Sequence, residues 1–209
     1  MILSVIAIII SSIAVVISGL TFYYHFLLKA IITVDYSNDN QEPYFVEGII
    51  GANNYKWVRI KALCSNKILN VSAKNLHLKM LSVEKYDSNN KKWDQLNPIN
   101  FFDLRWVNDK NPTQFTYYGD LTRYEPQYFN LATLVNAGGK QLLYPGIPNQ
   151  GNVAGWNPNT WFTEGYFRYT IGAYGDNVKF IHNKTHTLKI EVVFAQGWNV
   201  SFCNTSDIK

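Results

Sequence analysis

Charge, histidine and cysteine are scarce in this sequence. Only 16% of the 209 residues are charged, the formal net charge is +4, and there are four histidines and two cysteines. The adjacent basic pair Lys91-Lys92 lies among Asp and Asn residues that are typical of a turn. Nucleic-acid-binding domains usually cluster their lysines and arginines. The sparse and balanced charge therefore predicts that nucleic acid is not a partner.

The short motifs of common catalytic and nucleotide-binding sites are also missing. No G-x-S-x-G, P-loop or G-x-G-x-x-G pattern occurs, because Gly172 and Gly175 lack a third glycine and a following helix. The carboxylates Asp103, Asp120 and Glu125 stand at separations that define no acid–base pair. We therefore expect a protein without catalytic residues or cofactor. A membrane-tethered hydrolase with an unrecognised site is the enzymatic alternative.

Charge disappears altogether from one long stretch at the N-terminus. From Ile2 to Tyr24 the chain has no Asp, Glu, Lys, Arg, Asn, Gln or Pro. As an α-helix that rises about 1.5 Å per residue, such a run spans a hydrocarbon core about 30 Å thick. Tyr23 and Lys29 suit the interface at its end. The pattern predicts a single-pass transmembrane anchor over residues 1–28, which contacts the lipid bilayer through residues 2–28.

Two other interpretations of this stretch are open. A cleaved signal peptide normally has a basic start, an apolar run of about 7–15 residues and an A-x-A-like cleavage site. Here only Val16-Ile17-Ser18 approaches such a site. A helix buried in a soluble core is the other possibility, but this stretch is apolar on every face and too long for a domain of this size. The anchor is the preferred prediction.

The side of the membrane on which the remaining chain lies is not fixed by the sequence. Lys29 directly after the span favours a cytoplasmic domain under the positive-inside rule. Cys64 and Cys203 are compatible with a disulfide outside the cell or with two thiols inside it. Four sequons are no strong excess in a chain so rich in Asn, Ser and Thr. If the domain is extracytoplasmic, their glycosylation acceptors are Asn70, Asn183, Asn199 and Asn204.

Beyond Lys29 the apolar residues alternate with polar ones, which is the pattern of half-buried β-strands. In residues 55–64, Val58 and Ile60 lie on one face and Arg59 on the other. Residues 75–87 start with the same alternation and slip in phase after Met80, which predicts a β-bulge. The DSNNKK sequence predicts a hairpin turn. Further strands are predicted at residues 30–36, 99–106, 127–135, 165–174 and 186–194.

The number of predicted strands and the segments between them indicate the fold class. Residues 136–160 are rich in Gly, Pro and Asn and are predicted to form a long loop. Seven or eight strands without a convincing amphipathic helix favour a mainly β fold. The prediction is a Greek-key β-sandwich over residues 29–209, preceded by one N-terminal transmembrane α-helix.

A resemblance supports this architecture. The segments YKWVRIKALCSNKILNVSAKNLHLKMLSVEKYD, DLTRYEPQYFNLATL and YFRYTIGAYGDN resemble the immunoglobulin-like sandwich domains of prokaryotic surface proteins, of the CARDB or fibronectin type III kind. The chain is also similar to uncharacterised prokaryotic single-span membrane proteins with such a domain. The resemblance covers residues 30–195 and implies a fold but no catalytic residues. Unlike an antibody domain, the chain has Cys203 after its last predicted strand.

Aromatic residues and two histidines supply the binding candidates. Trp156, Trp161 and Tyr166 stand beside amide and carboxyl side chains, a composition suited to stacking on a sugar, although aromatic rings also pack cores. His182 and His186 have a spacing found in zinc sites, but no third ligand lies nearby in the sequence, so no metal is predicted.

The predicted function is a membrane-anchored, non-enzymatic β-sandwich that acts in protein interaction or as a structural component. We expect a protein partner to bind an exposed Trp57 or the long loop over residues 136–160, because recognition is usually carried by loops on a rigid scaffold. The alternative is a cell-surface carbohydrate-binding module that takes a glycan on its aromatic platform.

Overall fold

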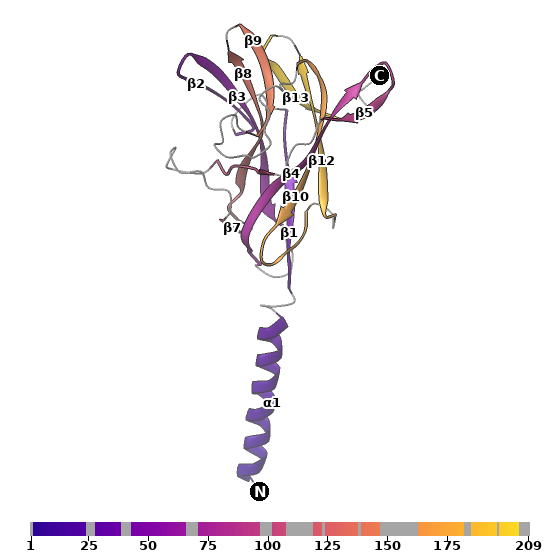
Figure 1. Cartoon of the computed structure of the whole chain (residues 1–209). Coiled ribbons are helices and arrows are strands. Elements are labelled where there is room, and N and C mark those ends of the chain that lie inside the picture. The colour runs from indigo at the N-terminus through magenta and orange to yellow at the C-terminus, as the bar shows by residue number, and fades with distance from the viewer. Residues whose placement is uncertain are drawn as a thin grey trace.

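The structure is a computed structural model, and it has two parts (Figure 1). They meet just before residue 30, where the sequence changes from a continuous apolar run to alternating apolar and polar residues. One N-terminal helix, α1 (Ile2–Phe22), projects from the end of a body made of two β-sheets. The prediction of a mainly β fold after an apolar N-terminal helix is confirmed. The structure describes residues 2–23, 28–38, 43–65, 71–96, 102–107, 119–122, 124–137, 139–146, 163–181, 185–195 and 197–204.

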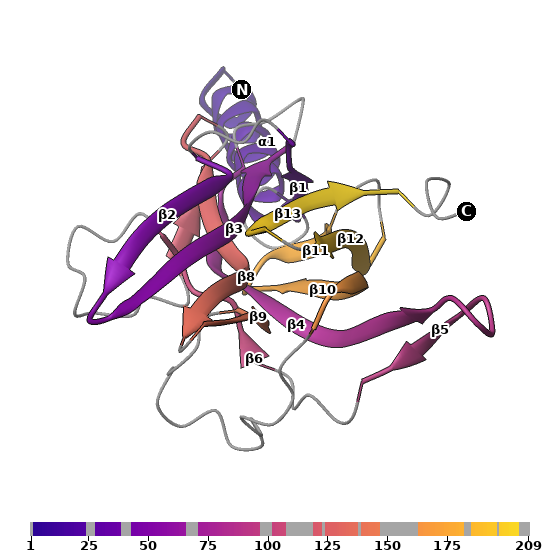
Figure 2. The ribbon, with the colours of Figure 1, turned by 90° about the horizontal axis from the view of Figure 1, so that it is seen from above.

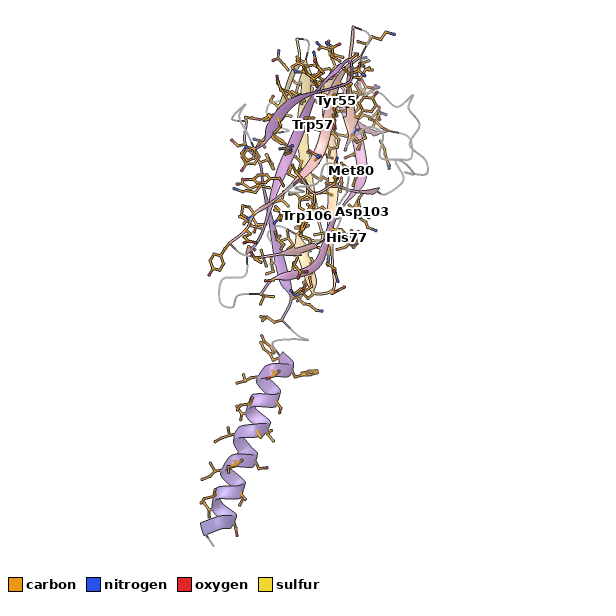
Figure 3. All side chains as sticks on the ribbon, turned by 90° about the vertical axis from the view of Figure 1, so that its left-hand side faces the viewer. Tyr55, Trp57, His77, Met80, Asp103 and Trp106 are labelled. Atoms are coloured by element: carbon orange, nitrogen blue, oxygen red, sulfur yellow. The ribbon has the colours of Figure 1, made fainter. Side chains whose placement is uncertain are left out.

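Helix α1 satisfies its own polar groups and exposes its apolar side chains. The hydroxyls of Ser12 and Thr21 donate to the carbonyls of Ile8 and Ile17, at 2.9 and 2.8 Å. None of the 19-residue stretch Ser4–Phe22 is buried, and its side chains project in all directions (Figure 3). The helix is long and apolar enough to cross a membrane, although a signal sequence near an N-terminus can have the same properties.

Sheet 1 has six strands in the order β11-β1-β3-β8-β9, with β2 beside β3. One edge of β3 pairs with β8, while β1 and β2 follow one another along the other edge. Strand β1 is parallel to β11, and the remaining pairs are antiparallel. The strands are β1 (Ala30–Asp35), β2 (Phe45–Ile50), β3 (Asn53–Cys64), β8 (Gln127–Ala137), β9 (Lys140–Pro145) and β11 (Val178–Ile181).

Sheet 2 has seven strands in the order β13-β12-β10-β4-β5, and all its pairs are antiparallel. Three short strands, β5, β6 and β7, pair with different segments of the long strand β4. Seen from above, the β2–β3 and β4–β5 hairpins extend away from the body in different directions (Figure 2). The strands are β4 (Ala73–Asp87), β5 (Lys92–Gln95), β6 (Phe102–Asp103), β7 (Gly119–Leu121), β10 (Gly165–Tyr174), β12 (Thr187–Ala195) and β13 (Asn199–Cys203).

The core lies between the sheets and follows the predicted alternation. On β3, every second residue from Val58 to Cys64 is buried, and the intervening residues are partly exposed. On β10, Phe167, Tyr169 and Ile171 are fully buried, and burial raises the pKa of the Tyr169 phenol well above its ordinary value. The largest fully buried side chains of the core include Tyr169, Phe129, Phe167, Ile32, Ile60, Leu76, Leu78 and Met80.

Two local predictions are confirmed in β4 and at its end. Thr170 of β10 lies opposite Ser82 while Ile171 lies opposite Met80, so Leu81 is the extra residue of a β-bulge. The burial pattern accordingly changes phase, and Val83 is the next fully buried residue.

The predicted DSNNKK turn joins β4 to β5. The Asp87 carboxylate accepts the backbone N–H of Asn89 at 2.9 Å and the side-chain amide of Asn90 at 2.6 Å. These two bonds, with that of the Asn90 amide the larger, lower the pKa of Asp87. Lys91 completes the turn with a φ of 52°.

Other parts of the predicted pattern were wrong. Residues 136–160 do not form one long loop: Ala137 pairs with Lys140, Gly139 turns the chain at a φ of 78°, and β9 follows. Glycine adopts this φ without strain, so it makes a tight hairpin here. Residues 147–160 lie outside the described residues. The strand predicted at 99–106 is reduced among the described residues to β6 and one bridge from Trp106 to Phe129.

Next to the helix, Asn177 bonds to strands of both sheets. The side chain of Asn177, in the turn before β11, donates to the Ser72 carbonyl and accepts the backbone N–H of Lys74, both at 2.8 Å. Its backbone carbonyl accepts the N–H of Ala30, the first residue of β1, at 2.7 Å. Asn177 thus ties the start of β4 in sheet 2 to the start of β1 in sheet 1.

Asn38 makes the corresponding connection further along. It follows β1, and its side-chain amide both donates to the carbonyl and accepts the N–H of Phe202 on β13, at 2.8 and 2.7 Å. An amide side chain that pairs with both backbone groups of one residue mimics a neighbouring strand. It therefore satisfies backbone groups at the edge of sheet 2.

We expect Asn177→Ala to destabilise the domain by about 1–2 kcal/mol, because a backbone carbonyl and an N–H lose their partners. Thermal or urea unfolding of the body measures the change. Asn54→Ala, at an exposed position on β3, is the matched control and should have little effect. Equal stability of the two variants would show that Asn177 does not join the sheets.

Candidate functional site

The residues predicted as binding candidates do not meet at one place. Trp57 lies on β3 in sheet 1, whereas Tyr166 lies on β10 in sheet 2. Trp156, Trp161 and His182 lie outside the described residues, so the structure does not test the aromatic platform or the histidine pair as they were predicted. His186 is exposed. Each described candidate has to be judged from its own neighbours.

Trp57 is half-buried, so the expectation of an exposed ring was wrong. Its ring stacks on Tyr55, with centroids 6.0 Å apart and an interplanar angle of 11°. Gly48 on β2 leaves room for the ring, because a Cβ there would lie 2.7 Å from it. Trp57 packs against a second apolar cluster formed by Tyr55, Val135, Leu142 and Tyr144.

Burial in that cluster, and then the nearby Tyr55 hydroxyl, raises the pKa of the Tyr144 phenol. Figure 3 shows Tyr55 and Trp57 together on the part of the body distant from α1. The contacts of both rings are those of side chains that stabilise a sheet.

Tyr166 belongs to the most connected polar and aromatic group that the structure describes. Its ring meets Tyr86 edge-on at 6.5 Å, and Tyr86 meets Trp93 edge-on at 5.3 Å. The Arg168 guanidinium lies 3.9 Å from the centre of the Trp93 ring. We call this group the Arg168 cluster, and its members are Glu84, Tyr86, Trp93, Tyr166, Arg168 and Glu191.

The Arg168 cluster sets one arginine against two glutamates, so Arg168 is shared between two carboxylates. The Arg168 guanidinium bonds Oε1 of Glu191 through both Nε and NH2, at 2.9 and 2.8 Å, and its third nitrogen, NH1, lies 3.8 Å from Glu84 Oε2. The side chains of Arg168 and Glu191 are only 14% and 10% exposed. A two-point bond of this kind fixes the guanidinium plane, which in turn covers one face of Trp93.

This geometry decides what the cluster can do. It connects β12, β10, β4 and β5 side by side, so it fastens the projecting β4–β5 hairpin to the sheet. The guanidinium already occupies one face of Trp93, and the two tyrosines meet their neighbours edge-on. A sugar would therefore have to share the Trp93 ring with Arg168.

His77 and Asp103 form the second polar group. His77 Nδ1 lies 3.7 Å from Asp103 Oδ1, which also lies 3.9 Å from Lys79 Nζ. The Tyr174 ring meets the imidazole edge-on at 5.8 Å. Figure 3 places His77 and Asp103 side by side in the part of the body nearer the helix.

A histidine beside a carboxylate is a familiar general base. However, 3.7 Å is longer than a hydrogen bond, and within the described chain His77 has no hydrogen bond to a Ser, Thr or Cys that it could activate.

The remaining carboxylates and histidines form no metal site in the part of the chain that the structure describes. No group of three or more His, Cys, Asp or Glu residues comes together there. Asp120 bonds Lys74 at 2.5 Å, and that ammonium lowers the pKa of the Asp120 carboxyl. Glu125 donates its backbone N–H to Thr122 in the turn after β7 and does not join Asp120.

The cysteines and sequons are separate from these groups. Cys64 is buried, with Sγ 2.7 Å from the Val71 carbonyl, and Cys203 is half-buried on β13, so no disulfide joins them. Asn199 and Asn204 are exposed, as a glycosylation acceptor must be. Asn70 and Asn183 lie outside the described residues.

Arg168 and Trp93 were not singled out from the sequence. Arg168 stands at an outward position of a strand with a clear alternation, between Tyr166 and Thr170, which is an ordinary place for an arginine. Its partners come from three other strands, and strand pairing over such separations is not contained in local periodicity.

No protein-family model, curated protein or solved structure matches this chain.

We expect Arg168→Met to destabilise the domain by about 3 kcal/mol, because it leaves the largely buried Glu191 carboxylate without its partner. Urea unfolding at neutral pH measures the loss. Lys189→Met, on the neighbouring strand and exposed, is the control for removing a positive charge and should be nearly neutral. Arg168→Met combined with Glu191→Gln should recover part of the loss. Additive effects of the two changes would argue against the ion pair.

Proposed function

We propose that the chain is a single-pass membrane protein that displays a non-enzymatic β-sandwich beside the bilayer and acts through contacts with another protein. The observation that carries the anchor is the exposure of α1. Large apolar side chains along it are about half or more exposed, from Val5 at 52% to Leu20 at 63%. Lipid is the solvent in which such a surface is favourable.

The length of α1 agrees with a permanent span. Twenty-one residues extend about 31 Å as a helix, which matches a hydrocarbon core of about 30 Å. The strand β1 begins at Ala30, and its side chain has no exposed surface. A cleavage at Val16-Ile17-Ser18 would leave an apolar helical remnant attached to the sandwich, which favours retention of the whole helix.

The strand order supports an immunoglobulin-like Greek-key topology for the sandwich. The chain alternates between the sheets, since β3 and β8 are neighbours in sheet 1 while β4 and β10 are neighbours in sheet 2. In immunoglobulin-like domains the B and E strands pair in one sheet and the C and F strands in the other. Strand β9, which follows β8 at the edge of sheet 1, is a departure from that plan.

The proposed partner surface is the tip of the β2–β3 hairpin, far from α1 (Figure 1). Ile49 is 75% exposed and Ile50 is 57% exposed, and the tip residues Gly51 and Ala52 are exposed as well. Two neighbouring isoleucines in water on a projecting hairpin are typical of a contact site. Residues 147–160 of the segment predicted as a loop lie outside the described residues, so the structure does not test them as a partner surface.

We expect Ile13→Arg to release the chain from membranes, because a charge near the centre of a span opposes insertion by about 2.5–3.5 kcal/mol. Alkaline carbonate extraction and vesicle flotation measure the release, and Ile13→Leu is the control. The unmodified chain should keep Ile2 in its mature form, as mass spectrometry of the N-terminus will show. A soluble mature chain that starts after Ser18 would contradict the anchor.

A carbohydrate-binding module is the second candidate, and the Arg168 cluster is the observation that favours it. Tyr166 and Trp93 lie on neighbouring parts of one sheet beside an arginine and two carboxylates. Aromatic rings bind the apolar faces of sugars while charged groups bond their hydroxyls. Because Arg168 already bonds Glu191 and covers one face of Trp93, this candidate is weaker than protein contact.

Two variants separate these candidates. We expect Ile49→Glu to abolish the co-purification of a stoichiometric partner from solubilised membranes, while Tyr166→Ala leaves it intact. Glycan-array binding that Tyr166→Ala removes and Ile49→Glu does not would support the carbohydrate module instead. Both variants are first checked for an unchanged unfolding temperature, so that loss of folding is not mistaken for loss of binding.

A further inference from the structure

We propose that the helix-proximal end of the sandwich rests in the lipid headgroup layer, with Tyr124 as its aromatic contact. The inference builds on the proposed membrane anchor. It assigns a second membrane contact to the folded body, in addition to α1. The occupant is the headgroup layer of the bilayer that α1 spans.

Described residues on the two sides of the junction contact one another, which holds the body close to the helix. An extended chain reaches about 3.3–3.6 Å per residue, so the stretch between Tyr23 and Ala30 would otherwise form a long tether. Instead the Leu28 N–H donates to the Tyr23 carbonyl at 2.9 Å, and the Leu28 side chain packs against the core of the sandwich. The body therefore begins within one turn of the helix end.

The same end of the body is fixed by Asn177. Its backbone carbonyl accepts the N–H of Ala30, and its side chain holds Ser72 and Lys74 on either side of Ala73. These bonds connect the start of β1 to the start of β4. The first strands of both sheets are thus attached to the junction.

Tyr124 lies at this end. Leu121, the last residue of β7, is opposite Ala73, and β8 begins at Gln127 opposite Ala62 near the end of β3. The turn between β7 and β8 therefore lies beside the residues that hold Asn177 (Figure 1). Within that turn, Tyr124 is 73% exposed, the largest exposed fraction of any aromatic ring that the structure describes.

A tyrosine in this position suits the headgroup layer. Each such layer is about 5–8 Å thick, and tyrosine is enriched there because its ring is apolar and its hydroxyl is polar. In the ion pair beside the β7–β8 turn, the charges of Lys74 and Asp120 cancel. The contact of Tyr124 should therefore depend on its aromatic ring, while Lys29 at the junction adds an attraction to anionic lipid.

The test uses the full chain in phosphatidylcholine vesicles, with Cys203→Ser so that the buried Cys64 is the remaining native thiol. An environment-sensitive fluorophore is attached at Tyr124→Cys, or at Ile49→Cys on the distant hairpin tip as the matched exposed control. We expect lipids that carry a spin label on the headgroup to quench the probe at 124 several-fold more than the probe at 49.

Flotation of the same vesicles separates this inference from the anchor. Failure to float would overturn the proposed anchor. Flotation with equal quenching at 124 and 49 would overturn only the headgroup contact. A probe at 124 that is shielded from aqueous iodide yet unquenched by lipid would mean that a protein covers this end, which also contradicts the inference.

A second measurement needs no substitution. With the unmodified chain, a photoreactive lipid headgroup should label the peptide that contains Tyr124 and leave the peptide that contains Ile49 unlabelled. Equal labelling of the two peptides would contradict the contact even if the cysteine variants fail to fold.

Discussion

The hydrogen bonds of Asn177 determine how the apolar helix and the β-sandwich form one molecule. A parallel pair of strands, β1 and β11, begins at this residue, and the start of β4 in the other sheet is held by its side chain. The neighbouring Asp176 strengthens this connection, because its backbone N–H donates to the Lys74 carbonyl at 3.1 Å. With it, both sheets start from the same place, and Ala30 can be fully buried one residue after Lys29.

Polar side chains on the sheet faces also bond to groups on other strands. Arg168 contacts the carboxylates of Glu84 and Glu191 and the indole of Trp93. The Lys56 ammonium lies 3.0 Å from the Glu47 carboxylate and donates to the Trp198 carbonyl at 3.3 Å. Groups that satisfy one another across several strands are positioned by the fold and in turn stabilise it. They have little remaining capacity to bind a ligand strongly. The ends of the sandwich are therefore better places to look for function than its faces.

The sequence allowed prediction of those features that depend on neighbouring residues. The strand over 165–174 has the predicted bounds, and the phase slip after Met80 located the bulge at Leu81, because both follow from alternation along one strand. The hairpin that joins β8 to β9 was missed, since glycine-rich segments fit long loops and tight turns equally well. The strand β2 was missed because FVEGII has no clean alternation.

The candidate sites were less predictable for the same reason. The stacking of Trp57 on Tyr55 depends on Gly48 from another strand, and the environment of Tyr166 depends on Tyr86 and the hairpin beyond it. Neither relation is visible in local periodicity. A tryptophan at an outward strand position is thus predicted to be exposed, although a neighbouring glycine lets it lie flat against the sheet.

The packing of Leu28 against the sandwich gives the two ends of the body different tasks. Strand β3 has 12 residues and so extends about 40 Å, from the hairpin tip to the end that holds the helix. If the body rests on the headgroups, Ile49 and Ile50 are held at a height set by this strand instead of by a flexible tether. A partner in the same membrane must then be about as tall as the sandwich, whereas a partner on a facing surface needs no such match.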